Sequence, residues 1–381
     1  MGFARGMFGL ALVLAVTVWV NSPAAASEAD GRMAAYLAGM PKAELHLHLE
    51  GSIDPATVVE LSRRNKLGYF STVAEIEASL ANRPPGLMGF LEHHFKLQEV
   101  MQTRQDFYDA TFSLLRNLHE NNVVYVDLFF DPQAHTSRGI AFAELFDGID
   151  AARQDGEAIF GLTVNLIMCF HRERSVESAM EMLDQAYSLR DRIIGLGMDS
   201  GPEDGNPPLK FREVYARARE EGYYLTGHHD VDVQDSLKHI RQSLEILQLD
   251  RIDHGLNASD DPALMADLVR RDICLTGSPI KRTTDPAPQD VDRIRTLDAA
   301  GVCVSLHTDD PEEFESGYLT NLLILFQEES GYSKAAMTRL MLNAFRALWV
   351  SDAEKSAYVD MLRRYAEAHG VAWTEVTGTP F

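Results

Sequence analysis

Short apolar runs alternate with amphipathic helical stretches along most of the chain. A segment of alternating apolar and polar residues, 43–51, comes first. Strand-like runs then follow at residues 123–130, 160–168, 193–198, 223–227, 250–253, 272–276 and 301–306. Apolar positions at helical spacing separate them, near residues 142–154, 175–188, 210–221, 235–247, 261–270 and 287–299. Strands that alternate with helices pair in parallel, so eight such units predict an α/β fold, the (β/α)8 TIM barrel.

Two additions to the barrel are expected from the same periodicity. Residues 72–120 have helical spacing throughout, which predicts a helical insertion after the first strand that covers one end of the sheet. Residues 335–348 and 353–369 predict C-terminal helices outside the barrel. The alternative is an open doubly wound sheet, but no Gly-x-Gly-x-x-Gly follows an early strand. No linker or repeat divides residues 27–381, which we interpret as a single domain.

The first 26 residues have the pattern of a signal peptide. Arg5 precedes an uncharged apolar run from Met7 to Val20, and Ala24-Ala25-Ala26 forms a small-residue cleavage site before Ser27. The alternative, a membrane anchor, is disfavoured because the run is short for a span of about 20 residues. We therefore expect a secreted or periplasmic protein with no stable membrane anchor after cleavage. A short polar lead separates this segment from the first strand.

Cysteine content and net charge indicate the state of the thiols and the kinds of partner that the protein can bind. Cys169, Cys274 and Cys303 all lie in apolar, strand-like contexts, which predicts buried thiols rather than a disulfide framework. The formal charge is −22, from 57 acidic and 35 basic residues. Such a surface repels phosphate backbones, so we expect no nucleic-acid partner. No apolar stripe indicates an oligomeric state.

Histidines and carboxylates gather where strands end. Strand alternation places His46 and His48 on one face, so two imidazoles can converge on one metal ion. Further clusters follow the fifth, sixth and eighth strands, at residues 228–232, 253–254 and 307–310. Each alone is compatible with a structural role, but the carboxyl ends of barrel strands meet at one face. Imidazole and carboxylate ligands suit Zn²⁺, which activates water, so the pattern predicts a hydrolase.

These clusters belong to a wider set of motifs. They are Pro41–Ser52, Phe129–Gln133 with His135 and Arg138–Ile140, Gly197–Ser200 with Asn206–Pro208, Arg251–Gly255, and Thr308–Pro311. In this combination the chain resembles the adenosine/adenine deaminase family of the amidohydrolase superfamily, from Pro41 to about Leu348. The resemblance implies a small-molecule purine as the substrate and one Zn²⁺ per chain as the cofactor.

The resemblance also implies roles for individual residues. The metal ligands would be His46, His48, His228 and Asp309. Three other positions would act on water or substrate: His254 would orient or deprotonate the attacking water, Asp310 would hold N7 of the purine, and the turn at Ser200-Gly201 would bind the purine edge. Water would add at C6 and ammonia would leave.

Two departures from the family pattern concern substrate chemistry. The family commonly has Glu three residues after the metal-binding histidine of the fifth strand, where it protonates N1, but this chain has Val231. Asp230 or Asp232 would have to replace it, and we favour Asp232. After the seventh strand, Lys281 and Arg282 stand where the family has small polar residues. They either pair with the acidic surface or alter the choice of substrate.

The sequence therefore predicts zinc-dependent deamination of a 6-aminopurine, adenosine or adenine, to the 6-oxopurine. Two alternatives remain open at this point. One is an amidohydrolase that acts on a different substrate, because barrels change chemistry through their loops. The other is a secreted purine-binding protein whose catalysis is impaired by Val231.

Overall fold

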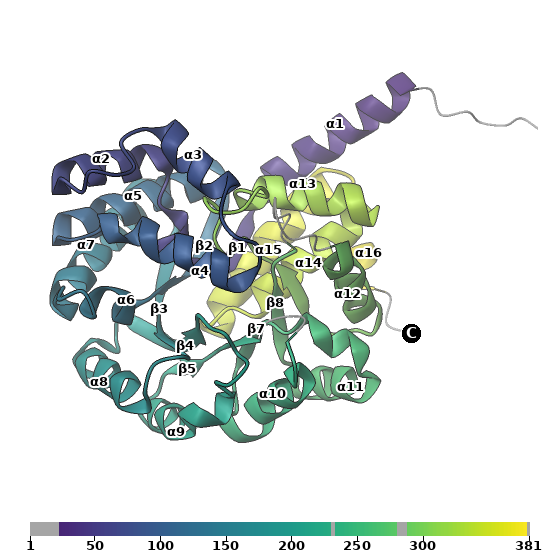
Figure 1. Ribbon diagram of the computed structural model, residues 1–381. Coiled ribbons are helices and arrows are strands. Elements are labelled where there is room, and N and C mark those ends of the chain that lie inside the picture. Colours follow the sequence, from purple (N-terminus) through teal and green to yellow (C-terminus); the bar gives the residue numbers. More distant parts are fainter. Residues whose placement is uncertain (1–22, 230–232, 280–287, 379–381) are drawn as a thin grey trace, which may run out of the picture.

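A closed ring of parallel strands forms the centre of the molecule (Figure 1). The computed structural model describes residues 23–229, 233–279 and 288–378. The strands are β1 (Lys42–His48), β2 (Val123–Phe130), β3 (Thr163–His171), β4 (Ile193–Asp199), β5 (Tyr224–Leu225), β6 (His228–His229), β7 (Arg251–His254), β8 (Cys274–Gly277) and β9 (Val304–Leu306). They pair in sequence order within two sheets, β1 to β5 and β6 to β9.

Backbone hydrogen bonds join these two sheets into one barrel. The Thr226 amide donates to the Leu196 carbonyl and the Asp253 amide to the Gly227 carbonyl, so β5 and β6 are two parts of one interrupted strand. At the other seam, the His48 amide donates to the Asp309 carbonyl and the Asp309 amide to the His46 carbonyl, each at 2.9 Å. The predicted (β/α)8 barrel is confirmed.

The chain between β1 and β2 forms the predicted helical insertion. It contains η1 (Glu50–Ser52), α2 (Pro55–Asn65), α3 (Val73–Ala81), α4 (Gly86–Leu97), η2 (Gln98–Val100) and α5 (Arg104–Glu120). α5 packs against α7 (Phe142–Phe160) on the outside of the barrel. α4 instead lies across the ends of the strands (Figure 1). The insertion thus supplies a cover for one end of the barrel.

The remaining helices surround the strands. They are α6 (Pro132–Thr136), α8 (Val176–Ala186), η3 (Tyr187–Leu189), η4 (Pro208–Phe211), α9 (Arg212–Glu220), α10 (Ser236–Gln242), η5 (Ser243–Leu247), η6 (Leu256–Asp260), α11 (Pro262–Arg271), α12 (Pro288–Ala299), α13 (Leu319–Ser330), α14 (Lys334–Arg346), α15 (Asp352–Ala368) and α16 (Trp373–Thr377). The last three include the predicted C-terminal helices. α14 packs against β1 and β9, so it closes the ring of helices.

Burial of both faces of β1 explains how its sequence positions the histidines. All seven residues of β1 are buried, as expected for a parallel strand between helices and barrel interior. Leu45 and Leu47 belong to the main hydrophobic core. Because side chains alternate along a strand, His46 and His48 point to the barrel interior instead.

The segment before β1 is a helix rather than the expected polar lead. α1 spans Pro23–Gly39, and its last turns are anchored by buried Tyr36 and Leu37. The Tyr36 hydroxyl is 2.6 Å from the Thr338 hydroxyl of α14. Residues 1–22, which hold most of the predicted signal peptide, lie outside the described residues. Within the described ranges, no helix combines the length and apolar character needed to cross a membrane.

The prediction of three free thiols is wrong. Cys274 and Cys303 form a disulfide with their Cα atoms 4.5 Å apart, while Cys169 is a buried free thiol. Cys274 begins β8 and Cys303 immediately precedes β9, so the parallel pairing of these strands brings the two cysteines together. Their separation of 29 residues is one strand–helix–strand unit of the barrel. The bond joins the amino ends of two neighbouring strands.

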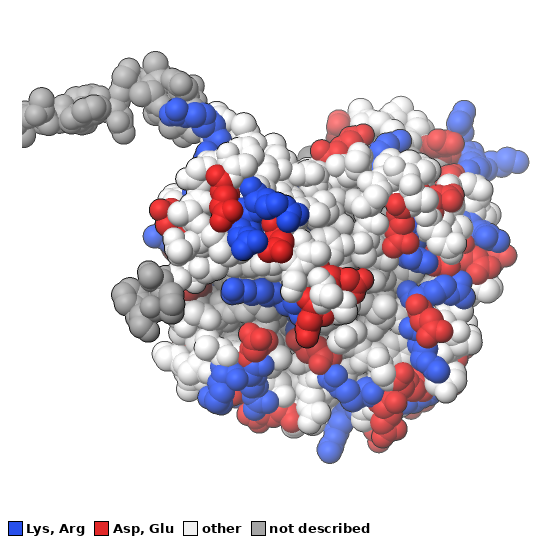
Figure 2. Space-filling model, turned by 180° about the vertical axis from the view of Figure 1, so that it is seen from behind, with Lys and Arg blue, Asp and Glu red and all other residues white. Residues whose placement is uncertain are grey.

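Acidic and basic side chains are interspersed on the face of the molecule drawn in Figure 2. The acidic surplus of the chain therefore does not form a patch of a single sign on that face. Local ion pairs also occur on the surface of the molecule, such as Arg217 with both Asp184 and Glu221.

Candidate active site

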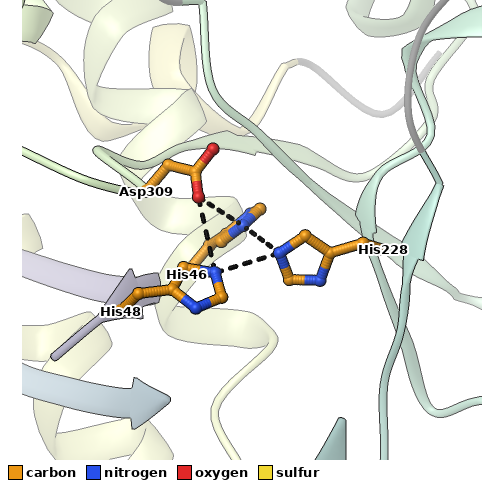
Figure 3. A group of neighbouring side chains, drawn as sticks. All are labelled: His46, His48, His228 and Asp309. Atoms are coloured by element: carbon orange, nitrogen blue, oxygen red, sulfur yellow. Dashed lines mark hydrogen bonds and ion pairs between the residues drawn. The ribbon is translucent and has the colours of Figure 1, made fainter. Parts of the chain in front are cut away.

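Three imidazoles and one carboxylate meet at the carboxyl ends of the barrel strands (Figure 3). His46 and His48 come from β1, His228 from β6, and Asp309 from the residues after β9. His228 Nε2 is 3.0 Å from Nε2 of both His46 and His48. Asp309 Oδ1 is 3.3 Å from His46 Nε2 and 3.4 Å from His48 Nε2. The structure brings together all four predicted metal ligands.

The second nitrogen of each imidazole faces an oxygen atom. His46 Nδ1 is 3.1 Å from the Thr276 carbonyl oxygen, and His228 Nδ1 is 3.4 Å from Asp253 Oδ2. His48 Nδ1 is 3.6 Å from Asp199 Oδ2. The hydrogen bond at His46 Nδ1 directs its Nε2 at the centre of the group, and the carboxylates of Asp253 and Asp199 lie on the Nδ1 side of the other two rings.

The carboxylate of Asp309 favours a positive charge within this group. Burial favours the neutral form of His46, but Asp309 outweighs burial and raises the pKa of His46 to about 9. Burial and the neighbouring His228 lower the pKa of His48 to about 3. Adjacent imidazoles thus compete for a single positive charge.

The donor set also fits zinc geometrically. A tetrahedral zinc site with Zn–N bonds of about 2.0–2.1 Å separates its ligand atoms by about 3.3 Å. The distances of 3.0–3.4 Å among these four side chains match that spacing. The residues present therefore fit a bound Zn²⁺.

Three residues around the group have left-handed backbones. The φ angles are 58° at Ser200, 57° at His254 and 63° at Asp309. This conformation costs free energy in residues other than glycine, and such residues are often found at functional sites.

The His254 ring lies beside the metal-binding group. His254 Nε2 is 3.6 Å from Asp309 Oδ2. Burial and the nearby His46 lower the pKa of His254 well below its usual value, so its ring is neutral.

Asp310 lies beside the metal-binding group and under the turn after β1. A Cβ atom at Gly51 would come within 1.8 Å of Asp310 Oδ1, so only glycine allows this close approach. Burial, together with the negative charges of Asp309 and Glu313, raises the pKa of Asp310 well above its usual value. The Asp310 carboxyl can therefore donate a hydrogen bond.

A pocket connects the metal-binding group to the underside of α4. Its polar wall includes His48, His228, His254, Asp309, Asp310 and Ser200. Its apolar wall is formed by Leu87, Phe90, Leu91 and Phe95 of α4 together with Phe314. Phe90 and Phe314 stack with their ring centroids 5.2 Å apart. A flat, largely apolar ring with polar edge atoms suits this combination of walls.

Sequence reasoning missed the residues that hold α4 in place. His93 and His94 lie in the predicted helical insertion, and both are buried. His94 Nδ1 is 2.6 Å from Glu313 Oε1, and His93 Nδ1 is 3.3 Å from Glu313 Oε2. Glu313 follows the Asp309-Asp310-Pro311 motif by only a few residues. The paired histidines on one helix were the signal, but their partner lies 219 and 220 residues away.

Sequence reasoning also missed two carboxyl groups and one imidazole in the pocket wall. Asp131, His171 and Asp199 stand at the carboxyl ends of β2, β3 and β4, and all three line the pocket. Of these, Asp131 and Asp199 lay within the motifs that carry the family resemblance, but no role was given to them.

The remaining predicted positions divide into two groups. Ser200 lines the pocket, and Gly201 lies against α4, with a side-chain atom of Leu87 2.9 Å from the place of a Cβ. The predicted proton donors Asp230 and Asp232, with Val231 between them, lie outside the described residues. Lys281 and Arg282 also lie outside them.

Comparisons with known proteins agree with this geometry. The family model described as "Adenosine deaminase" matches residues 41–365. An adenine deaminase of Chlorobium luteolum is 37% identical over 335 residues, covering 87% of this chain and 96% of that protein. The crystal structure of an adenine deaminase from Arthrobacter aurescens is 31% identical with a TM-score of 0.78, covering 86% of this chain and all of that one. A zinc-bound amidohydrolase from Burkholderia ambifaria is 26% identical with a TM-score of 0.79, covering 89% and 94%.

Proposed function

Because the chain belongs to the adenosine deaminase family, we propose that it is a zinc-dependent enzyme that converts adenine to hypoxanthine and ammonia. Hydrolytic deamination itself follows from the family. The choice of metal and of substrate is our proposal, which extends the prediction of a 6-aminopurine substrate. The observation that carries it is the convergence of four metal-binding side chains with Asp310 and an apolar-walled pocket.

The metal would be held by His46, His48, His228 and Asp309. When bound there, Zn²⁺ acts as a Lewis acid that lowers the pKa of water towards about 7. His254 Nε2 faces the same space and is neutral, so it can accept the proton of the attacking water. Two observations support the choice of metal. The amidohydrolase from Burkholderia ambifaria has bound zinc, and the imidazole and carboxylate ligands of this chain suit zinc.

The purine would lie between the metal-binding group and α4. With C6 beside the four ligands, Asp310 would donate to N7, and Ser200 would face the opposite edge of the ring. The side chains of α4 would cover the ring face and exclude water, which strengthens polar interactions in the site. Several curated relatives are named adenine deaminases, which favours the free base over adenosine.

N1 requires a proton donor, and Asp232 stays our prediction for it. Val231 has no titratable group, so one of its neighbours must act if the reaction proceeds. The alternative of a binding protein without catalysis gains no support, because the relatives are deaminases.

We also propose that the protein is exported from the cytoplasm. The pattern of residues 1–26 supports this, and so does the Cys274–Cys303 disulfide. Disulfides are typical of oxidising compartments such as the periplasm and are rare in the cytosol.

A substrate screen tests the proposed function. Zinc-loaded protein would be assayed for ammonia release from adenine, adenosine, other 6-substituted purines and unrelated cyclic amidines. We expect adenine to be the best substrate. The variants Asp232→Ala and Asp230→Ala identify the donor, because loss of general acid catalysis lowers kcat by about 10²–10⁴-fold. Ammonia release only from a non-purine compound would overturn the proposal in favour of a different amidohydrolase.

A further inference from the structure

One motif is not used by the proposed chemistry. Residues Asp131-Pro132-Gln133 and His135 follow β2, and the Asp131 carboxylate lies within 4.8 Å of a ring nitrogen of His48. Their contacts hold one local structure in place. The Asp131 amide donates to Glu50 Oε1 at 3.0 Å, and His135 Nε2 lies 3.0 Å from the same oxygen. Gln133 Oε1 accepts a hydrogen bond from the His171 amide at 2.7 Å.

The motif therefore fixes the backbones that carry Asp131 and His171, while their side chains project into the pocket. Asp131 is 4% exposed and His171 is fully buried. His171 Nε2 is 3.5 Å from Asp131 Oδ2, and neither His171 Nε2 nor Asp131 Oδ1 has a hydrogen-bond partner among the described residues. Buried polar atoms are rarely left without hydrogen-bond partners, so a bound ligand is expected to supply the partners of these two atoms.

Asp199 is the other carboxyl group near this position, but it has a different neighbour. Asp199 Oδ2 lies 3.6 Å from Nδ1 of His48, and both carboxylate oxygens of Asp199 are likewise without a hydrogen-bond partner among the described residues. Asp199 ends β4, next to Ser200, whereas Asp131 follows β2. Asp131 is thus the carboxylate on the β2 side of the pocket.

The order of strands around the barrel indicates which edge of a bound purine ring lies next to Asp131. With C6 at the metal-binding group, the nitrogen atoms around a purine follow in the order N1, N3, N9 and N7. The loop after β6 is predicted to serve N1, Ser200 after β4 lies towards N3, and Asp310 after β9 lies towards N7. The strands between β4 and β9 in that direction are β3, β2 and β1. His171 and Asp131 end β3 and β2, which is the position that N9 occupies.

We propose that Asp131, held by His171, accepts a hydrogen bond from N9–H of a free purine base and thereby determines specificity against N9-substituted purines. This inference rests on the proposed function and deepens it. A nucleoside has no N9–H, and its sugar would occupy the space of the Asp131 carboxylate. A site built to bind an N–H group rejects an analogue that lacks it, because the buried acceptor then stays unpaired.

The test compares two substrates on the same protein. The ratio of kcat/KM for adenine to that for 9-methyladenine is measured by ammonia release in wild type and in Asp131→Ala. We expect a wild-type ratio of about 10² or more. In Asp131→Ala, kcat/KM for adenine should fall by a similar factor while that for 9-methyladenine is unchanged or rises, so that the ratio approaches one. General damage to the site would lower both values and leave the ratio unchanged.

Two controls keep the test decisive. Asp292→Ala removes an exposed carboxylate of α12 and should leave the ratio at its wild-type value. If Asp131→Ala does not fold, Asp131→Asn removes the charge at nearly constant volume, and its ratio should also fall. A wild-type ratio near one, or a ratio unaffected by either substitution, would overturn the inference while the deaminase function stands. Failure to deaminate any aminopurine would instead contradict the proposed function.

Discussion

The two ends of the barrel satisfy their polar groups in different ways. At the carboxyl end, carboxylate atoms that line the pocket, such as Asp131 Oδ1 and Asp310 Oδ1, have no hydrogen-bond partner among the described residues. Towards the amino end, Arg251 Nη1 donates to Asp127 at 2.8 Å inside the barrel. The Arg251 guanidinium also lies 4.0 Å from the centroid of the Trp349 ring, while its Nε and Nη2 have no hydrogen-bond partner among the described residues. Asp127 also accepts a hydrogen bond from the Tyr125 hydroxyl at 2.8 Å.

Lys42 and the Cys274–Cys303 disulfide also satisfy polar or reactive groups at the amino end of the barrel. Lys42 at the start of β1 is buried, but its amine donates to the carbonyl oxygens of Ala38, Met40 and Asn121. Cys274 and Cys303 join the starts of two strands covalently. The amino end thus uses polar chemistry for stability, and the carboxyl end leaves it available to ligands. Substitutions should therefore separate activity from stability according to the end at which they are made.

The largest effect is expected at the carboxyl end. Replacing Asp309 with Ala removes a predicted metal ligand, so kcat/KM for adenine should fall by about 10³-fold or more, since several kcal/mol of transition-state stabilisation depend on the metal. Cooperative unfolding in urea should persist. The measurement is ammonia release together with the metal content of the purified variant. Wild-type activity in this variant would contradict the assignment.

At the amino end the expected loss is in stability. Asp127→Ala leaves the Arg251 guanidinium buried without its carboxylate, which typically costs about 3–5 kcal/mol in the free energy of unfolding. Urea denaturation measures this cost, and kcat/KM of the folded fraction should stay near wild type. Tyr125→Phe is the comparison variant because it keeps the ion pair and removes the hydroxyl that donates to the same carboxylate and accepts from Asn165. A hydrogen bond to a charged group is typically worth about 1.5–3 kcal/mol, so its loss should be smaller. Equal losses in the two variants would show that the ion pair is not what stabilises this end.

The disulfide should have a smaller effect of the same kind. The double variant Cys274→Ser and Cys303→Ser releases a closed loop of the unfolded chain, and we expect a loss of about 2–4 kcal/mol in stability with unchanged kcat/KM. Wild type treated with a thiol reductant should show the same decrease in the melting temperature, while the variant should not respond. If the reductant lowered the melting temperature of both proteins, the loss of stability would not come from the Cys274–Cys303 disulfide.

The last prediction at the amino end is a pH dependence of stability from Lys42. Burial lowers the pKa of Lys42 from 10.5 to about 7. Between these values the unfolded chain binds more protons than the folded chain, so Lys42 makes the free energy of unfolding rise with pH from about 7 to about 10. Lys42→Met should flatten this rise, as measured by urea denaturation across the window. An identical slope in both proteins would exclude Lys42 as its source.

Local patterns were enough to predict the barrel and half of the metal-binding group. Alternation within β1 places His46 and His48 on one face, and the regular spacing of strands and helices specifies parallel pairing. The ends of the strands place the clusters 228–232 and 307–310 at the same face, and the family resemblance then selects His228 and Asp309 as ligands. The barrel and the His46/His48 pair depend on periodicity, which a single sequence contains.

Contacts between distant segments were not predictable in the same way. The position of α4 depends on Glu313, and nothing near His94 indicates that partner. Asp131 and His171 lie at the ends of adjacent strands, but their approach to 3.5 Å depends on the exact twist and register of the barrel. The disulfide was missed because each cysteine alone fits a buried strand. Pairing becomes evident only once β8 and β9 are known to be neighbours.

Removal and return of the metal tests the central claim most directly. Wild-type protein would be stripped with a chelator, assayed with adenine, and titrated with Zn²⁺ while ammonia release is followed. We predict that activity disappears on stripping and returns with about one Zn²⁺ per chain, whereas Asp309→Ala does not regain it. Undiminished deamination of adenine by the stripped protein would contradict the account, as would zinc-loaded protein that releases no ammonia from adenine.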